Sequence, residues 1–437
     1  MNRRRVVITG MGTVTPHSDN VDTLFAQLCE GVSAVQRITQ FDPEGLPAQI
    51  AAEVRYEVDG PAQVGRYACD SRTMKFVTAA AQRALADAGL EDELAPDDPE
   101  RYVRAVHLSS GVGSTAMEAL GPLTLGVWGS PDSTEKRDLV ALRRAIAAHP
   151  ETAQHVEDWF CDFAAPALAV MFGADRISTA ASACASGSHA LMDAMHMIQL
   201  GRAKRVLTGG VCTPVTRSMM PGFAMLSALS TRNEVPHAAS RPFDADRSGF
   251  IMGEGSSLMV LEDLEAAQAR GARIHGEILG AGIATDAYRL TDPEPTGRGM
   301  GEAMRRALKD AGLAPENVDY INAHGTSTKL NDAAESKAVK AAFGEQAYSI
   351  PMSSTKSMFG HLIHAAGITE AIVCTKTIQD GRITPTINYE TPDPDCDLDY
   401  VPNTAREATV KVAMNNSFGF GGQNVSVLIG AYDGGRA

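Results

Sequence analysis

The chain has 437 residues, of which 44% are hydrophobic and 21% are charged, and its formal net charge at pH 7 is −14. This composition is typical of a globular protein with room for two domains or two fused halves. The acidic balance argues against a nucleic-acid partner, and no apolar run is long enough to span a membrane. The seven cysteines form no CxxC pair and no metal-type spacing, so we expect a cytoplasmic protein without disulfides or a bound metal ion.

The first predicted element is a buried strand at residues 5–9, which is followed at once by Gly10 and Gly12. A Gly-x-Gly pair after a first strand is part of the dinucleotide-binding fingerprint. Thr15 stands where the third glycine of that fingerprint is needed. We therefore expect no dinucleotide cofactor.

An octapeptide occurs twice, about half the chain apart. Residues 83–90 read RALADAGL and residues 306–313 read RALKDAGL. Each copy ends an amphipathic helix, and Gly89 and Gly312 are well placed to end those helices in the left-handed conformation. A strand is predicted after each copy.

The same order of helix, glycine and strand in both places predicts a duplicated α/β chain, with halves at residues 1–265 and 266–437. The acidic stretch at residues 393–399 is predicted to be a surface loop. The expected buried strands lie at residues 5–9, 103–108, 205–208, 256–261, 318–323, 350–354 and 425–429.

Cys184 lies in a turn of small residues, 182–187, directly before a helical pattern that runs to about Leu200. A cysteine at a helix N-terminus lies near the positive end of the helix dipole, which lowers the pKa of the thiol and favours the nucleophilic thiolate. The alternative is a small buried apolar residue, which is the commoner role of a lone cysteine. The apolar face of the predicted helix is formed by Leu191, Ala194, Met195 and Ile198.

Two histidines stand where a site is expected, because sites in open α/β sheets form at the carboxyl ends of strands. His324 follows the strand at 318–323, and His361 follows Gly360 and opens a helical run. The helix dipole should keep the His361 imidazole neutral, so that it can donate a hydrogen bond to a developing oxyanion. Taken singly, a histidine in such a place is more often structural. His364 forms a His-x-x-His pair with His361, but no nearby carboxylate or thiol completes a metal site, and we interpret it as a helix-surface or packing residue.

Two further segments can support such a site. Lys356 lies in a short polar turn between apolar elements, which favours a hydrogen-bonded structural cation, and Glu335 is its expected counter-ion. The glycine-rich segment 415–422 lets the backbone approach a ligand and aim an N–H at an oxyanion. The alternative for this segment is a tight hairpin before the strand at 425–429.

Four motifs occur together: residues 183–187 (ACASG), 322–326 (NAHGT), 354–361 (STKSMFGH) and 416–422 (NSFGFGG). In this order they resemble the β-ketoacyl-[acyl-carrier-protein] synthases of the thiolase superfamily. These include the type II fatty-acid elongation enzymes and the ketosynthase α subunits of type II polyketide synthases. The resemblance covers nearly the whole chain except about residues 121–176, which we expect to shape the pocket or the subunit interface. Further matching segments are residues 230–233, 239–244 and 249–255.

The resemblance implies a thiolase-like fold, in which two similar α/β halves form αβαβα layers. It implies a dimer, either a homodimer or a heterodimer with a ketosynthase-like chain-length factor. Cys184 would accept an acyl group from the phosphopantetheine of an acyl carrier protein as a thioester. His324 and His361 would promote decarboxylation of a malonyl carrier protein, whose carbanion attacks the acyl-Cys184 carbonyl to give a 3-oxoacyl carrier protein and CO2. No cofactor is implied beyond the phosphopantetheine arm of the carrier protein.

The resemblance also implies supporting roles. Backbone N–H groups of Cys184 and Phe420 would form the oxyanion hole, and the Phe420 ring would gate the acyl pocket. Lys356 and Glu335 would support the two histidines. The residues implied to contact the substrate or the pantetheine arm are Thr326, Thr328, Phe418, Phe223 and Met117, and those implied to dock the carrier protein are Arg72 and Lys75.

Some residues depart from one branch of the family or the other. Residues 329–332 (KLND) look like the polyketide type, whereas residues 416–420 (NSFGF) are closer to the fatty-acid type. Ser227 stands where the fatty-acid enzymes often carry a carrier-binding arginine, and Arg289 replaces a usual histidine. Glu118, if it points into the pocket, favours a short, polar or unusual acyl chain.

Two alternatives compete with a condensing enzyme. A degradative thiolase needs a second catalytic cysteine near the C-terminus, where this chain has Ser417, and Cys396 in its acidic loop is a poor substitute. A non-catalytic chain-length factor typically lacks the nucleophile, and Cys184 argues against that reading. The sequence therefore predicts a decarboxylating condensing enzyme and leaves its acyl chain and its pathway open.

Overall fold

The structure is a computed structural model that describes residues 3–91, 98–111 and 162–434. Its main strands fall into two groups of five. The N-terminal half supplies β1 (Val6–Val14), β6 (Arg104–Ser110), β7 (Arg176–Ala180), β8 (Arg205–Cys212) and β9 (Gly255–Asp263). The C-terminal half supplies β10 (Gly276–Thr285), β11 (Tyr320–Asn322), β12 (Met352–Ser353), β15 (Val412–Gly419) and β16 (Gln423–Gly430).

These strands form one ten-stranded sheet with the order β12-β11-β15-β16-β10-β1-β9-β8-β6-β7. Read outward from the central β1–β10 pair, the order has the same pattern in both directions. In each half the two inner pairings are antiparallel and the two outer pairings are parallel. The duplication predicted from the sequence is therefore confirmed in the sheet topology.

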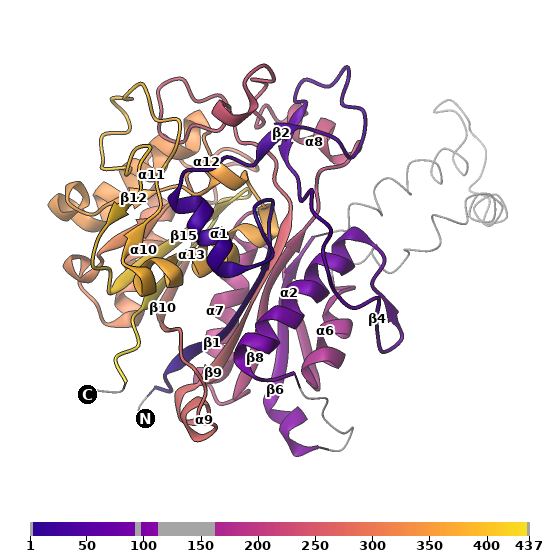
Figure 1. Ribbon diagram of the computed structural model, residues 1–437. Helices are drawn as coiled ribbons and strands as arrows, with labels where there is room; N and C mark the ends of the chain where they lie inside the picture. The colour runs from indigo at the N-terminus through magenta and orange to yellow at the C-terminus, as the bar shows by residue number, and fades with distance from the viewer. Residues whose placement is uncertain (1–2, 92–97, 112–161, 435–437) are drawn as a thin grey trace, which may run out of the picture.

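The two copies of the octapeptide end equivalent helices, α2 (Arg72–Ala88) and α10 (Arg298–Ala311). Both helices end at a glycine in the left-handed conformation, Gly89 with φ 62° and Gly312 with φ 67°, as predicted. Helix α2 packs on β1 and β9, and α10 packs on β10 and β16. The two helices cover opposite outer faces of the molecule, accompanied by α6 (Ala165–Phe172) and α11 (Lys329–Phe343) (Figure 1).

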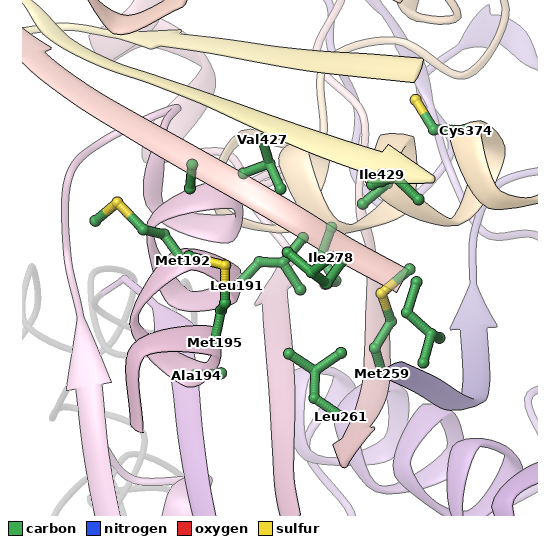
Figure 2. Close-up of a cluster of buried hydrophobic side chains, with 14 of the residues drawn as sticks. Leu191, Met192, Ala194, Met195, Met259, Leu261, Ile278, Cys374, Val427 and Ile429 are labelled. Carbon is green, nitrogen blue, oxygen red and sulfur yellow. The ribbon is translucent and has the colours of Figure 1, made fainter. Parts of the chain in front are cut away.

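A second pair of equivalent helices, α7 (Ser186–Gln199) and α13 (Ala366–Asp380), forms the middle layer. These helices pack against each other and against strands of both halves, which completes a layered αβαβα arrangement. In Figure 2, Leu191 and Met195 of α7 lie among Leu261 of β9, Ile278 of β10 and Ile429 of β16, all of them buried. Burial of one such side chain contributes about 1.5–3 kcal/mol to the free energy of folding. The cluster therefore stabilises the contact between the two halves.

Shorter elements complete the described chain. The remaining α-helices are α1 (Val21–Cys29), α8 (Met219–Met225), α9 (Leu264–Ala269) and α12 (Lys356–Phe359). The short strands form the pairs β2 (Val35–Arg37) with β3 (Ile50–Ala52), β4 (Gln63–Val64) with β5 (Tyr67–Ala68), and β13 (Arg382–Ile383) with β14 (Arg406–Glu407).

Every strand expected from the sequence is present, with different ends. The segment at 350–354 keeps only two strand residues in β12, and the segment at 318–323 keeps three in β11. The acidic segment 393–399 is free of helix and strand, as predicted. Within the described residues, no helix is both long enough and apolar enough to cross a membrane.

Candidate active site

Cys184 lies in a sharp turn between strand β7 and helix α7, where the sequence analysis placed it. The preceding residue, Ala183, has φ 49°, a left-handed conformation that is uncommon for a residue with a side chain and marks local strain. Two hydrogen bonds hold the turn: the Ser182 N–H donates to Ser186 Oγ at 2.8 Å, and Ser186 Oγ donates to the Ala183 carbonyl at 2.6 Å. The turn thus presents the thiol at the start of a helix in a fixed position.

The environment of the Cys184 thiol differs from the expectation of a ready thiolate. Burial raises its pKa to about 11, and this effect exceeds the lowering by the backbone N–H of Phe420, by the Lys356 charge and by its own N–H. The backbone N–H groups at the helix start do lower the pKa, as predicted, but desolvation outweighs them, so the expected thiolate is not the state of the resting protein. The backbone N–H groups of Phe420 and Cys184 both lie within hydrogen-bonding reach of the sulfur.

Two cavities meet at Cys184 and Phe420, which line both of them. The first has a volume of about 370 Å³ and the second about 320 Å³, within the range of small-molecule sites. The first cavity is walled in part by Thr326, Thr328, Phe418, Phe250, His324 and His361. The second is walled in part by Phe223, Ile363, Met219, Val211, Cys212 and His364.

His324 and His361 stand side by side in the first cavity. His324 follows β11, and His361 follows α12, and their ring centroids are 5.3 Å apart with the planes at 82°. Burial, with the nearby Lys356 charge, holds the pKa of both imidazoles well below the usual 6.5. Both rings are therefore neutral at physiological pH. This confirms the neutral state expected of His361 but assigns it to burial rather than to a helix dipole.

Each of these histidines has a ring nitrogen that can form a hydrogen bond with a ligand. Nδ1 of His361 accepts a hydrogen bond from the backbone N–H of Ile363 at 3.2 Å, so the ring proton is on Nε2. This Nε2 and the Nδ1 of His324 are buried without a hydrogen-bond partner among the described residues. Phe250 and Phe418 pack edge-on against the two rings and keep the surroundings apolar.

Lys356 is buried and forms an ion pair and a hydrogen bond with Glu370 of α13. The prediction that Glu335 is its counter-ion is therefore wrong. The carboxylate of Glu335 instead accepts hydrogen bonds from the backbone N–H groups of His324 and Gly325, both at 2.8 Å. Burial raises the pKa of Glu335 and of Glu370 to about 7. Glu335 thus fixes the backbone that carries His324, while Lys356 lowers the pKa of both histidines.

Glu370 is a functional residue that the sequence reasoning missed. It lies between Ile368 and Ile372 in the predicted helix, on a stretch that the structure buries completely. Burial of a carboxylate is costly unless it is paired with a cation. An acidic residue among the apolar residues of a predicted buried helix therefore indicated that Glu370 has a buried cationic partner. Phe250 was also missed, because nothing in its local sequence connects it with His361.

The implied substrate contacts divide between the two cavities. Thr326, Thr328 and Phe418 line the first, Phe223 lines the second, and Phe420 lines both. The two threonine hydroxyls are hydrogen-bonded to each other at 3.0 Å. Met117, together with Glu118, lies outside the described residues.

The two implied docking residues differ in exposure. Arg72 donates to Glu254 at 2.9 Å and to the Val54 carbonyl at 2.7 Å, so its guanidinium is committed within the molecule. Lys75, one turn further along α2, is exposed. Only Lys75 of this pair presents an uncommitted charge to solvent.

His364 occupies a place that the sequence did not indicate. It lies in a 3-10 turn (Ile363–Ala365) before α13 and forms part of the wall of the second cavity. Of the two interpretations from the sequence, the helix-surface residue is therefore wrong, and the packing residue agrees with the contact of the ring with Gly111. Among the residues that the structure describes, no group of three or more His, Cys, Asp and Glu side chains is arranged to hold a metal ion.

Comparison with known proteins identifies the family of this chain. Residues 3–267 match the family model of the β-ketoacyl synthase N-terminal domain, and residues 275–390 match that of the β-ketoacyl synthase C-terminal domain. The chain is 39% identical over 436 residues to a 3-oxoacyl-[acyl-carrier-protein] synthase 2 of Synechocystis sp., which covers 99% of both proteins.

Solved structures agree with the sequence relatives. One is a type II polyketide synthase acyl carrier protein in complex with its ketosynthase bound to the hexaketide, with a TM-score of 0.85, 33% identity, and coverage of 99% of this chain and 100% of that chain. Another is the ishigamide ketosynthase/chain length factor, with a TM-score of 0.83, 34% identity, and coverage of 98% of this chain and 100% of that chain. With a thiolase-like duplicated fold and both family models matched in order, the chain belongs to the β-ketoacyl synthase family.

Proposed function

We propose that this protein is a β-ketoacyl-[acyl-carrier-protein] synthase that joins an acyl group on Cys184 to a malonyl unit with loss of CO2. The observation that carries this proposal is the convergence at one junction of two cavities of a thiol, two neutral imidazoles and two backbone N–H groups. The sequence relatives bear the name of this activity.

The first step is acyl transfer. The sulfur of Cys184 attacks the thioester carbonyl of an acyl-phosphopantetheine that enters through the first cavity. A new C–S bond forms to Cys184, the C–S bond to pantetheine breaks, and the thiol proton passes to the departing pantetheine sulfur. A cysteine suits this step because it is both a good nucleophile and, later, a good leaving group. The acyl chain then extends into the second cavity, past Phe420.

The second step is decarboxylation of the malonyl thioester in the first cavity. The bond between the malonyl carboxylate and the α-carbon breaks, and CO2 leaves. The electron pair of the broken bond stays on the α-carbon and forms the enolate with the thioester carbonyl. Nε2–H of His361 donates a hydrogen bond to the enolate oxygen, together with the neutral ring of His324. No base is required, because no proton is removed. Neutral donors in an apolar cavity stabilise such a developing charge more than they would in water.

The third step forms the carbon–carbon bond. The enolate carbon attacks the acyl-Cys184 carbonyl, and the N–H groups of Cys184 and Phe420 hold the resulting oxyanion. Collapse of this intermediate expels the Cys184 thiolate, which takes up a proton from solvent, and releases the 3-oxoacyl carrier protein.

We propose an acyl carrier protein and a second ketosynthase-like subunit as partners. A structural relative is described in complex with its carrier protein, and another is described with a chain length factor. Strand β7 lies at one end of the described sheet, and all of its residues except Ala180 are exposed. An exposed edge strand is a natural place for a strand of another chain to pair.

The proposal is tested with malonyl- and acyl-carrier protein. The purified protein should release CO2 and carry the acyl group on Cys184, as detected by mass spectrometry of the digested protein. The Cys184→Ala variant should lose the acyl adduct and all elongation. Elongation that survives intact in Cys184→Ala would overturn the proposal. Activity that appears only when a second, cysteine-less homologue is added would support a heterodimer over a homodimer.

A further inference from the structure

The second cavity contains an imidazole that a hydrocarbon chain cannot satisfy. Most of its wall near Cys184 is apolar, with contributions from Phe223, Phe420, Ile363 and Met219. The imidazole of His364 interrupts this wall, and its Nδ1 is buried with no hydrogen-bond partner among the described residues.

The fold fixes the backbone of His364. Ser109 Oγ donates to its carbonyl oxygen at 3.2 Å, which ties the turn to strand β6. A Cβ atom placed on Gly187 would lie 2.9 Å from this carbonyl oxygen, and one on Gly210 would lie 2.5 Å from it. The start of α7 and strand β8 therefore pack tightly against the backbone of this turn. The side chain of His364 lines the second cavity.

The fold also makes room for the ring. A Cβ atom on Gly111 would lie 2.8 Å from Nδ1 of His364, so a residue larger than glycine there would displace the imidazole. Burial lowers the pKa of His364 to about 4, which leaves the ring neutral at physiological pH. A neutral imidazole has one N–H donor and one acceptor nitrogen, and it can pair with a hydroxyl or with a carbonyl oxygen.

We propose that His364 is a specificity-determining residue that recognises an oxygen substituent on the acyl chain. The enzyme would accept a chain bearing a hydroxyl or carbonyl group near the ring in preference to the saturated chain of equal length. This inference rests on the proposed function, because the chain occupies the second cavity only as the thioester of Cys184. A saturated chain would bury the imidazole against hydrocarbon without a partner, and a buried polar group left unpaired is penalised more than a paired one is rewarded.

The cavity wall offers further polar atoms beyond the ring. Ser110, Thr73 and Thr213 also line it, and the hydroxyls of Thr73 and Thr213 are hydrogen-bonded to each other at 2.6 Å. Polar atoms at more than one point of the wall suit a chain that carries oxygen at more than one carbon, as a partly reduced or unreduced polyketone does.

The test compares the acylation of Cys184 by pantetheine thioesters of one chain length. One is saturated, and the others carry a hydroxyl or a keto group at successive odd-numbered carbons. Mass spectrometry gives the rate constant for each. We expect one oxygenated chain to react about 10-fold faster or more than the saturated chain, since a site that hydrogen-bonds its substrate discriminates strongly against the analogue without that group. Equal rate constants for every chain in the wild-type protein would overturn the inference.

Variants assign the preference to His364. The measured quantity is the rate constant of the preferred oxygenated chain divided by that of the saturated chain. His364→Leu should bring this ratio close to one. His364→Asn, which keeps a donor and an acceptor near the position of Nδ1, should keep the ratio above one. Met219→Leu is the matched control, since it alters the shape of the same wall without a polar group and should keep the ratio. The ratio is independent of the fraction of folded enzyme, so a weakened variant remains informative. A preference that persists unchanged in His364→Leu would refute the role of the ring.

The two proposals fail differently. If the wild-type protein neither forms an acyl-Cys184 adduct with any chain nor releases CO2 from malonyl carrier protein, the proposed function fails and this inference fails with it. If both reactions occur and the chains react alike, only the role of His364 is wrong.

Discussion

Gly419 lies directly against the backbone of Ser182, at the base of the turn that carries the nucleophile. A Cβ atom on Gly419 would lie 2.7 Å from the Ser182 carbonyl oxygen and 3.2 Å from the Cys184 nitrogen. The end of strand β15 is thus set against the nucleophile turn by the absence of a side chain. Because Phe420 follows directly, this contact also sets the position of its N–H relative to Cys184.

The substitution Gly419→Ala should move the backbone N–H of Phe420 away from the backbone N–H of Cys184, and these two groups form the proposed oxyanion hole. A displacement of about 1 Å in a catalytic arrangement can lower the rate about 10²-fold, so we expect a loss of that order in kcat/KM for condensation. Circular dichroism and thermal unfolding will show whether the fold is retained. Gly222→Ala is the control, because a Cβ atom there meets no neighbouring atom and its backbone is not left-handed. Equal losses in the two variants would contradict this account.

Removal of the charge on Glu370 should destabilise the protein. Glu370→Gln leaves the buried ammonium of Lys356 without its carboxylate, and the loss of one partner from a buried pair costs about 3–5 kcal/mol. The free energy of unfolding can be measured with urea. Glu302→Gln removes a carboxylate of the same kind from the largely exposed pairs with Arg305 and Arg306, where a change within about 0.5 kcal/mol is expected. A comparable stability of both variants would show that the buried pair is not important for folding.

The raised pKa of Cys184 predicts a steep dependence of its alkylation on pH. With the folded-state pKa at about 11, the thiol is neutral at pH 7, and the thiolate fraction should rise about ten-fold for each pH unit up to pH 10. The rate of labelling by a small neutral alkylating agent, followed by mass spectrometry of the Cys184 peptide, should rise in the same way. Cys184→Ser provides the blank. A plateau near pH 7 would mean that the helix start outweighs burial after all.

The two histidines should be needed for decarboxylation and not for acyl transfer. His324→Ala and His361→Ala each remove one hydrogen-bond donor to the enolate oxygen, and the loss of such a donor lowers kcat about 10²–10³-fold. CO2 release from malonyl carrier protein measures this step, and acyl-Cys184 formation measures the other. His237→Ala is the control, because His237 is exposed and lines neither cavity. Parallel losses of both reactions would indicate structural rather than catalytic roles.

The duplication and the ends of several helices could be predicted from the sequence because local signals determine them. The two octapeptides end at glycines whose left-handed conformation stops a helix, and the structure contains both stops. The lengths of β11 and β12 could not be predicted in this way, since strand ends depend on which backbone groups find partners across the sheet. The counter-ion of Lys356 depends on the packing of α13 against α12, and no spacing rule favours Glu370 over Glu335.

The electrostatic state of the site was the hardest property to predict. The position of Cys184 before α7 was correct, but its pKa depends on how many atoms surround the sulfur, which a sequence does not state. For His361 the predicted neutral state was correct, but its cause is burial of the ring and not the helix dipole. The place of His364 in the cavity wall had no local signal, because the glycines that pack against its turn and its ring, Gly111, Gly187 and Gly210, come from three distant segments.

The symmetry of the sheet has a consequence for the origin of the active site. Helices α7 and α13 occupy equivalent places in the two halves, and each begins close to a residue of the active site. Cys184 lies two residues before α7, and His361 lies five residues before α13. A single ancestral unit that paired with its own copy would have presented the start of this helix twice to one shared cavity. After fusion, each copy was free to specialise, one toward a nucleophile and the other toward a hydrogen-bond donor. The division of labour between the two residues thus requires no new architecture, only independent changes near the starts of two equivalent helices.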